Sequence, residues 1–329
     1  MLGTTDPDNG ITKLTAITPT NTAYCPGWLA FLNESTGGDL ELIRFLQQWA
    51  GYALTGDTRE HALVFIYGPG GNGKSVFLNV LTGILHDYAT AAAMDTFTAS
   101  KGERHPTDLA MLRGARLVTA SETEEGRAWA ESRIKQMTGG DPISARFMRQ
   151  DFFTYRPSFK LTIIGNHKPV LRNVDEAARR RFNIVPFIRK PAQPDRGLEE
   201  KLKAEWPGIL RWMVEGCLDW QSAGLQRPDI VKATTEAYFD AQDLFGQWLE
   251  EECDAEIGNE YKWETTGLLF EAWSAYAQSA GESPGSKKAF SEAMQRRGFI
   301  ADKGKGGVRI FRGVRKRPNQ SGDKVAGGG

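Results

Sequence analysis

The chain has 329 residues, 40% hydrophobic and 25% charged, which is enough for two or three domains of ordinary soluble composition. No run approaches the roughly eighteen apolar residues of a membrane span, and the first residues lack a secretory signal, so we expect a cytoplasmic protein with no membrane partner. The formal net charge is zero, which argues against general attraction to nucleic acid, but residues 285–329 hold twelve Lys or Arg against three Asp or Glu, a local charge of +9.

The N-terminal part predicts a flexible lead followed by a small helical subdomain. Residues 1–22 are rich in Thr, Asn, Pro and Gly without periodicity, and this abrupt start favours a fragment of a longer protein. In residues 23–55, apolar side chains such as Leu40, Ile43 and Leu46 recur at helical spacing.

Residues 56–190 alternate short apolar runs with helical or loop segments. The runs 63–67, 116–120, 159–164 and 182–187 have the length of buried strands. Buried strands that alternate with helices are typical of a largely parallel sheet covered on both faces. The sequence therefore predicts an α/β domain here.

The remaining residues predict a helical lid or linker and a basic module. Residues 191–264 open on a segment with two prolines and a glycine and are then mainly helical, and the acidic run 240–256 is interpreted as a solvated helix face. Residues 265–318 contain a basic helix, a Gly-rich turn and a β-ribbon, which is the pattern of a winged helix. Residues 319–329 are predicted to be disordered.

The three cysteines indicate neither disulfides nor a zinc site. Cys25, Cys217 and Cys253 are odd in number and widely separated. We interpret them as reduced thiols without a chemical role.

One motif carries the strongest chemical signal. It fits G-x-x-x-x-G-K-[ST] without mismatch, after an apolar strand and before a helical segment, and consists of Gly68, Pro69, Gly70, Gly71, Asn72, Gly73, Lys74 and Ser75, with Val76 next in the helix. Such a loop wraps phosphate groups with backbone N–H groups, while its lysine reaches the β and γ phosphates and its hydroxyl binds Mg²⁺. The sequence predicts a site for ATP and Mg²⁺.

A phosphate loop needs a carboxylate at the end of a neighbouring strand, to hold the Mg²⁺ shell and polarise the attacking water. Glu122 follows the run 116–120, and Glu124 and Glu125 lie just beyond, so spacing alone leaves open which one faces the metal. Asn166 ends the third apolar run, where a polar side chain points into the same crevice.

Two groups of arginines are further candidates. One of Arg179, Arg180 and Arg181 is a candidate arginine finger, which neutralises charge on a transferred phosphoryl group, often from a neighbouring subunit. Residues 139–160 predict a β-hairpin with arginines and aromatic residues interleaved, a combination that suits single-stranded nucleic acid. The candidate DNA contacts are Arg146, Arg149 and Gln150 in this hairpin, which also carries Arg156, and Lys287, Lys288, Arg296 and Arg297 in the basic helix. The sequence leaves open whether Arg149 or Gln150 forms the hairpin tip.

In this order, the phosphate loop, SETEEG, TGGDP with its hairpin, IIGNHKP and RRRF resemble the superfamily 3 helicases, specifically the phage/plasmid primase-helicase family related to the poxvirus primase-helicase. The resemblance implies an AAA+-like sheet with the strand before the phosphate loop at its centre. It also implies ATP bound between the subunits of a ring, usually a hexamer, and a protein encoded by a phage or plasmid in the cytoplasm of a bacterial host.

The resemblance also assigns roles to single residues. Lys74 and Ser75 match the Walker A pair, Glu122 the Walker B acid, Asn166 the sensor that orients the attacking water, and Arg180 or Arg181 the arginine finger. The expected partners are single-stranded and forked DNA. Because this sequence has no room for a primase domain, we expect a primase or polymerase in a longer protein or in trans.

Two other functions stay open. The chain fits a DNA-remodelling or DNA-packaging ATPase without unwinding activity, or an origin-binding or loader protein in which nucleotide only sets the oligomeric state. A small-molecule kinase is disfavoured, because no acceptor signal accompanies the phosphate loop and the basic tail suits nucleic acid better.

Overall fold

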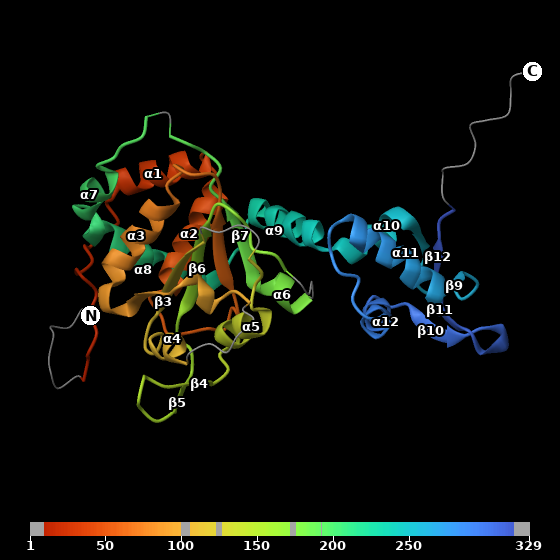
Figure 1. Cartoon of the computed structure of the whole chain (residues 1–329). Helices are drawn as coiled ribbons and strands as arrows, with labels where there is room; N and C mark the ends of the chain where they lie inside the picture. The colour runs from red at the N-terminus through yellow and green to blue at the C-terminus, as the bar shows by residue number, and fades with distance from the viewer. Residues whose placement is uncertain (1–9, 100–105, 123–126, 172–175, 192, 319–329) are drawn as a thin grey trace, which may run out of the picture. The chain divides into compact units, whose positions relative to one another are not determined.

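The computed structural model describes residues 10–99, 106–122, 127–171, 176–191 and 193–318. The chain forms two compact units, Met1–Gln242 and Asp243–Gly329 (Figure 1), which are described one at a time. In the described ranges, no helix combines the length and the apolar character that crossing a membrane would need.

A five-stranded parallel sheet forms the centre of the first unit. Its strands, in spatial order, are β2 (Ala89–Ala91), β3 (Leu117–Glu122), β6 (Lys160–Gly165), β1 (Leu63–Tyr67) and β7 (Phe182–Pro186). The predictions of a mixed α/β fold and of a largely parallel sheet are confirmed. β1 is an interior strand, but the expectation that it lies at the centre is wrong by one position, because β6 is the central strand.

Helices cover both faces of this sheet (Figure 1). Successive side chains of a strand point to opposite faces, so Val64 and Ile66 enter one hydrophobic core while Leu63 and Phe65 enter the other. The first core is built with α1 (Pro26–Thr36), α2 (Leu40–Tyr52), α3 (Lys74–Leu85), α7 (Leu198–Lys203) and α8 (Trp206–Ala223). The second is built with α4 (Thr107–Ala110), α5 (Glu131–Gly139), α6 (Glu176–Arg181) and α9 (Asp229–Gln242).

The helical N-terminal segment is packed into the first core through a close contact between α2 and α8. A side-chain carbon at Gly51 would lie 2.1 Å from the backbone nitrogen of Cys217, so only glycine allows the two helices to approach this closely. Arg44 adds a two-pronged ion pair to Asp219, with both nitrogen–oxygen distances at 2.8 Å. The segment is therefore part of the same folded body as the sheet.

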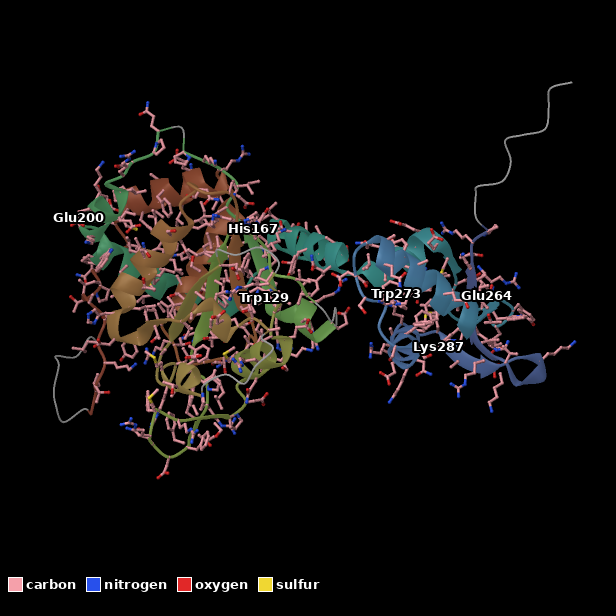
Figure 2. The ribbon with its side chains drawn as sticks, viewed as in Figure 1. Trp129, His167, Glu200, Glu264, Trp273 and Lys287 are labelled. Atoms are coloured by element: carbon pink, nitrogen blue, oxygen red, sulfur yellow. The ribbon has the colours of Figure 1, made fainter. Side chains whose placement is uncertain are left out.

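The second unit is a small helical core with antiparallel strands. It contains α10 (Leu244–Glu252), α11 (Thr266–Ser279) and α12 (Lys287–Arg296), a sheet of β10 (Ile300–Lys303), β11 (Arg309–Arg312) and β9 (Trp263–Thr265), and a ladder of β8 (Cys253–Ala255) with β12 (Val314–Lys316). Trp248, Trp273 and Phe290 pack edge to face in its core, and Figure 2 shows Trp273 there.

The acidic run 240–256 is not wholly a solvated face. The carboxylate of Asp243 accepts a hydrogen bond from the Gly246 N–H, which caps α10. The same carboxylate pairs with Arg297, and its side chain is only 16% exposed. Asp243 therefore fixes the start of α10 to the end of α12.

Candidate functional site

The predicted phosphate loop lies at the carboxyl edge of the parallel sheet. Loop 68–75 joins the end of β1 to the start of α3. On the neighbouring strands, Glu122 at the end of β3 lies opposite Gly165 at the end of β6, and Asn166 follows directly. Strands that run in parallel end at the same edge, so the structure brings loop 68–75, Glu122 and Asn166 together as the sequence predicts.

Lys74 is the centre of a hydrogen-bond network at this edge. Its ammonium donates to the carbonyls of Gly68 and Pro69 at 2.6 and 3.1 Å, to Asn72 Oδ1 at 3.0 Å and to Asn166 Oδ1 at 3.0 Å. The side chain is 7% exposed, and burial lowers the pKa of its ammonium below the ordinary value. A loop lysine is thus bonded directly to the residue at the end of β6.

The backbone of loop 68–75 leaves space where phosphate groups would lie. A side-chain carbon at Gly68 would lie 1.9 Å from the Phe187 carbonyl oxygen, so the loop passes tightly over β7 there. At Gly70 and Gly71 a side-chain carbon would meet no atom within 4 Å, and Gly71 has a positive φ of 79°. This open, Gly-lined curve before a helix N-terminus fits a polyphosphate.

The elements around the loop hold it from two sides. A side-chain carbon at Gly73 would lie 2.5 Å from the ring of Phe31 in α1, so the helical N-terminal segment packs against the loop. On the other side, Asn72 Nδ2 donates to the Phe187 carbonyl while its Oδ1 accepts from Lys74. The sequence predicts Asn72 as one of the residues of the ATP-binding loop, and its near-complete burial and two hydrogen bonds add a role in positioning the loop.

The groups expected to bind Mg²⁺ are Ser75 and Glu122. Ser75 is exposed in the first turn of α3, and Glu122 is 3% exposed. In the described part of the chain no cluster of three or more His, Cys, Asp or Glu side chains forms a metal cage. A hydroxyl and one carboxylate still fit Mg²⁺, which is usually held by few protein ligands together with phosphates and waters. Glu124 and Glu125 lie outside the described residues.

The three consecutive arginines differ in their contacts. Arg179 pairs with Asp240 of α9 at 3.0 Å and lies over the Phe239 ring at 5.2 Å. Arg181 turns back to the carbonyl of Ala177 at 2.8 Å. Arg180 is exposed, and its guanidinium donates to the carbonyl of Glu176 at 3.3 Å, with no ion pair to a residue that the structure describes. Of the two predicted finger residues, Arg180 has the guanidinium that is more available to another subunit.

The predicted hairpin is confirmed as a pair of short strands, β4 (Ile143–Ala145) and β5 (Phe153–Tyr155). Its connecting residues include the exposed Arg146, Arg149 and Gln150. Arg146 lies over the Phe152 ring at 4.6 Å, and Arg149 has a left-handed backbone with φ of 61°. At its base Arg156 donates to the Gly140 carbonyl at 3.2 Å. The tip thus exposes both cationic groups and an aromatic ring.

The four predicted contacts on α12 are not equivalent. Arg297 is committed to Asp243 and lies over the Phe245 ring at 5.2 Å. Lys287 lies 5.8 Å from the Phe270 ring centre, and Lys288 is 4.0 Å from Glu292. Arg296 is exposed. Arg297 therefore has a structural role that its position in the sequence did not indicate.

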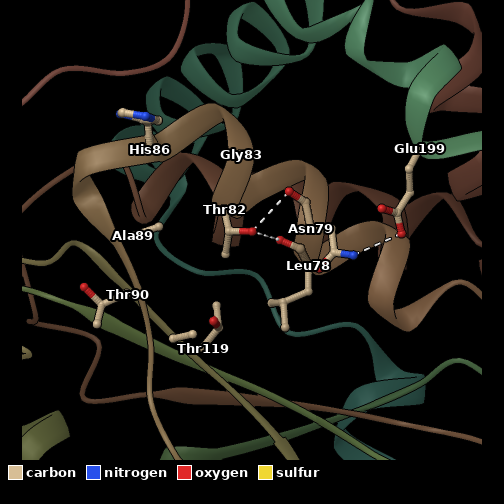
Figure 3. A pocket seen from close by; sticks show the side chains of 10 residues that line it. Leu78, Asn79, Thr82, Gly83, His86, Ala89, Thr90, Thr119 and Glu199 are labelled. Carbon is tan, nitrogen blue, oxygen red and sulfur yellow. Dashed lines mark hydrogen bonds between the residues drawn. The ribbon is translucent and has the colours of Figure 1, made fainter. Parts of the chain in front are cut away.

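One further feature of the first unit lies near the sheet but away from loop 68–75. A cavity of about 430 Å³ lies beside α3 and the edge strand β2, lined by Thr82, Thr90 and Thr119, with Asn79 bonded to Glu199 at 3.0 Å (Figure 3). Its lining includes no predicted site residue.

The three cysteines are free thiols. Cys25 and Cys253 are buried and Cys217 is partly buried.

Sequence reasoning did not single out Lys168, in the segment that follows Asn166. Its ammonium lies over the ring of Tyr67, the last residue of β1, at 4.4 Å, and 5.7 Å from the Tyr238 ring. Burial lowers its pKa. The only sign of Lys168 in the sequence was its position two residues after the candidate site residue Asn166.

Comparisons with known proteins found one family match and several viral relatives. A family of unknown function (DUF5906) matches residues 66–181. "Putative helicase 022R" of Frog virus 3 (isolate Goorha) is 26% identical over 232 residues, which is 63% of this chain and 24% of that protein. "Putative helicase L207/L206" of Acanthamoeba polyphaga mimivirus is 24% identical over 233 residues, 64% of this chain and 24% of that protein.

A solved structure shares the fold over most of the chain. The apo structure of the NrS-1 C-terminal region matches with a TM-score of 0.55 and 13% identity, covering 91% of this chain and 79% of that one. At this identity the likeness shows the fold alone. The chain spans about a quarter of the length of the two viral relatives.

Proposed function

We propose that this chain is the motor of a DNA helicase of superfamily 3, a phage- or plasmid-type replication protein that hydrolyses ATP at the subunit boundaries of a ring, usually a hexamer, and translocates on single-stranded DNA. The observation that carries the proposal is the Lys74 network, which joins an open Gly-lined loop to Asn166 at the carboxyl edge of the sheet. The names of the two viral relatives support a helicase.

The proposed roles follow from the positions of the side chains. Bound ATP would supply the phosphoanhydride bond that is broken, and the charge of Mg²⁺ would orient its phosphates. Backbone N–H groups of loop 68–75 and the N-terminus of α3 would hold the phosphates, and Lys74 would exchange its carbonyl partners for phosphate oxygens. Ser75 and Glu122 would hold the metal shell, and Glu122 and Asn166 would orient and polarise water.

A ring is supported by the position of Arg180. β1 and β7 run in register from Leu63 opposite Phe182 to Tyr67 opposite Pro186. Arg180 precedes β7, so it lies at the amino edge of the sheet, about 16 Å of strand away from loop 68–75. An arginine side chain is shorter than that distance. A finger at this position would serve the site of a neighbouring subunit.

The hairpin is proposed to contact DNA in the ring channel. Its tip exposes Arg146 and Arg149 beside the ring of Phe152. Cations meet phosphates and rings stack on bases of any sequence, which a translocating motor requires. The expected partners are single-stranded and forked DNA, and a primase or polymerase in the longer protein or in trans. The basic C-terminal module would be a winged helix that adds DNA affinity.

An ATPase assay with and without single-stranded DNA tests the proposal, together with unwinding of a forked duplex and a mass measurement of the oligomer. DNA-stimulated turnover with unwinding is the expected result. Turnover without unwinding would instead indicate a DNA-remodelling ATPase. Negligible DNA-stimulated turnover, with an oligomer that depends on nucleotide, would indicate a loader or switch protein.

A further inference from the structure

We propose that the second unit holds single-stranded DNA along its three-stranded sheet, between the exposed rings on the side of Trp263 and the cations at the end formed by the β10–β11 turn. Bases would stack on Tyr261 and Trp263. Phosphates would meet Lys303, Lys305 and Arg309. This inference deepens the proposed function and rests on its DNA partner, because it names a place outside the motor where the strand is held.

One row across the sheet faces outward. Trp263 of β9 lies opposite Arg312 of β11, which lies opposite Ile300 of β10. The next residue of β11, Phe311, points the other way into the helical core. Trp263 is 45% exposed and Ile300 is 53% exposed. The sheet thus presents a large ring, a guanidinium and an apolar side chain side by side.

The turn before β9 presents a second ring. Tyr261 is 90% exposed, yet the backbone around it is firmly held. Arg312 donates to the Glu260 carbonyl at 2.6 Å, Arg315 donates to the Tyr261 carbonyl at 3.2 Å, and the Tyr261 N–H donates to Asn259 Oδ1 at 3.0 Å. A ring this exposed adds almost nothing to the hydrophobic core. Its fixed backbone beside Arg312 makes it a preorganised stacking surface.

Unengaged cations lie at the end of the same sheet. Lys303 and Arg309 are opposite each other on β10 and β11, and Lys305 lies in the turn between them. Alternation along β11 puts Arg309 and its partner Lys303 on the same side of the sheet as Phe311, so they would meet the strand at the end of the sheet and not on the row of Trp263. All three are exposed, and none forms an ion pair with a described residue. At α12, Lys288 lies near Glu292 and the C-cap Arg297 is paired with Asp243, whereas Lys287 and Arg296 are exposed and form no ion pair with a described residue. The β10–β11 turn is therefore one of the places in this unit where exposed cations are available.

The combination of these groups favours nucleic acid over a protein partner. The centres of protein interfaces are enriched in aromatic residues but depleted in lysine. Surfaces that bind single strands instead place rings for stacking next to cations that follow the phosphates. Tyr261 and Trp263 with the flanking Lys303, Lys305 and Arg309 match the second pattern.

The test is the affinity of the full chain for a fluorescently labelled oligothymidylate, measured by anisotropy without nucleotide. An Arg146→Ala/Arg149→Ala background removes the contribution of the hairpin. In that background we expect Tyr261→Ala to weaken binding at least about fivefold, the loss of one stacked base. Tyr261→Phe should bind like the parent, because it keeps the ring. Tyr24→Ala, which removes an exposed tyrosine of the first unit, is the matched control.

The cations are tested by salt dependence. Replacing Lys303, Lys305 and Arg309 by Gln should make the slope of log affinity against log salt shallower by about two, since each single-strand phosphate contact contributes about 0.7. Lys287→Gln/Lys288→Gln on α12 should leave the slope unchanged. Parental affinity for Tyr261→Ala, or a slope that responds only to the α12 variant, would overturn the inference.

The same variants distinguish a protein partner at this surface from DNA, and failure of the proposed ATPase function from failure of this inference. Loss of self-association in Tyr261→Ala, with DNA affinity unchanged, would replace this surface by a docking site for a second copy. ATPase activity without DNA should be the same in Tyr261→Ala and in the parent. Absence of ATPase in the parent would count against the proposed motor and not against the DNA surface.

Discussion

Lys74 links the proposed nucleotide site to the end of β6. Four oxygen atoms share its ammonium, and one of them is Asn166 Oδ1. Phosphate oxygens can satisfy the ammonium only by replacing some of these partners. If Asn166 is among the partners replaced, its amide is released to bond elsewhere, which would link nucleotide binding to the proposed sensor.

We predict that Lys74→Ala lowers ATP turnover by about a hundredfold or more, because a preorganised donor to the transition-state charge is lost. The fold should be retained, since the partners of Lys74 lie on a loop at the sheet edge. ATPase rate and the thermal midpoint measure the two effects. Lys203→Ala, at a surface position of α7, is the control, and near-parental hydrolysis in Lys74→Ala would remove the assignment of the loop.

Glu122→Gln should separate binding from hydrolysis. The amide keeps the size of the carboxylate but polarises water less, so nucleotide affinity should stay within about threefold while turnover falls by about 10²-fold or more. Fluorescent-nucleotide titration and ATPase rate make the comparison. If affinity is lost and turnover per bound ATP is unchanged, Glu124 becomes the better candidate for the catalytic carboxylate.

The positions of the candidate site residues were predictable where the motif is contiguous in the sequence, and their roles stay predictions. The loop glycines, Lys74 and Ser75 form one motif, and Asn166 follows a recognisable strand. Contacts between distant residues were not predictable. Arg179 is bonded to Asp240, 61 residues away, and Arg297 to Asp243, 54 residues away. Spacing along the chain does not show which of several arginines has such a partner.

At the scale of elements, the strands with continuous apolar runs and the β4–β5 hairpin were predictable, whereas the edge strand β2 was not. β2 consists of Ala89, Thr90 and Ala91, which carry no strand signal, and it forms only because its backbone pairs with β3 at the sheet edge. The run 159–164 was predictable as a strand. The apolar pattern of this run gave no reason for Lys160, the first residue of β6.

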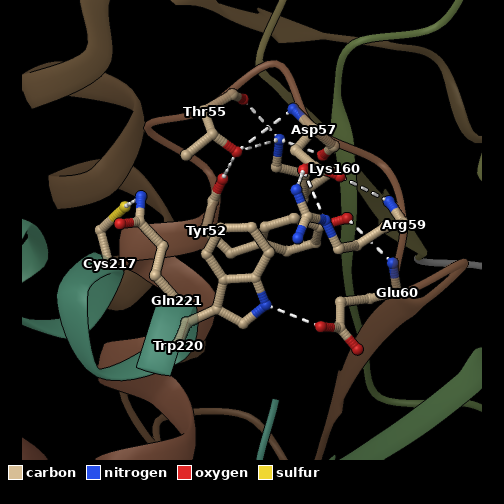
Figure 4. Close-up of polar contacts among 9 residues, drawn as sticks. All are labelled: Tyr52, Thr55, Asp57, Arg59, Glu60, Lys160, Cys217, Trp220 and Gln221. Atoms are coloured by element: carbon tan, nitrogen blue, oxygen red, sulfur yellow. Dashed lines mark hydrogen bonds and ion pairs between the residues drawn. The ribbon is translucent and has the colours of Figure 1, made fainter. Parts of the chain in front are cut away.

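Lys160 lies at the amino edge of the sheet and bonds to the segment that follows α2. Its buried ammonium donates to the carbonyls of Thr55 and Asp57 and lies 4.4 Å from the Tyr52 ring centre (Figure 4). The ring of Tyr52 in turn packs on Trp220 of α8, with centroids 4.4 Å apart. A cation inside β6 thus ties the strand to the loop after α2.

Lys160 should make stability depend on pH. Burial, reinforced by the Arg116 guanidinium, lowers its pKa from 10.5 to about 7. Between these two values the unfolded chain binds a proton that the folded chain lacks, so the free energy of unfolding rises with pH, by up to about 1.4 kcal/mol per unit. Below pH 7 both states are protonated and this contribution is constant.

Urea unfolding of the parent and of Lys160→Met, at several pH values from 7 to 9, measures this dependence. The difference in free energy of unfolding between the two proteins should grow with pH, because only the parent carries the lysine. Lys201→Met, at an exposed position of α7, should show no such trend. A difference that stays constant with pH would mean that Lys160 keeps its proton throughout.

At the scale of the whole molecule, the proposed functional groups of the first unit lie at two opposite edges of one sheet. Loop 68–75 follows the carboxyl end of β1, whereas Arg180 precedes β7 and the β4–β5 hairpin precedes β6. A single copy therefore separates its phosphate loop from its finger. Two neighbouring copies in a ring would bring the carboxyl edge of one to the amino edge of the next.

This arrangement makes a prediction that a monomeric ATPase does not satisfy. A subunit with Arg180→Ala would spoil the site of its neighbour and leave its own loop intact, whereas a subunit with Lys74→Ala would spoil only its own site. Each variant alone should be inactive. Mixed rings contain interfaces that pair an intact Lys74 with an intact Arg180, and at equal amounts of the two proteins about a quarter of interfaces would be complete if subunits mix at random.

ATPase activity measured over a series of mixing ratios should therefore rise from near zero to a maximum at equal amounts and fall again. Preformed rings must be dissociated before mixing, and native mass measurements must show that mixed rings form. Arg181→Ala is the matched comparison, because its guanidinium is turned to the Ala177 carbonyl and should contribute no complementation of this kind. If activity stays at zero at every ratio although mixed rings are present, Arg180 acts within its own subunit or only on the fold, and the proposal of shared sites is lost.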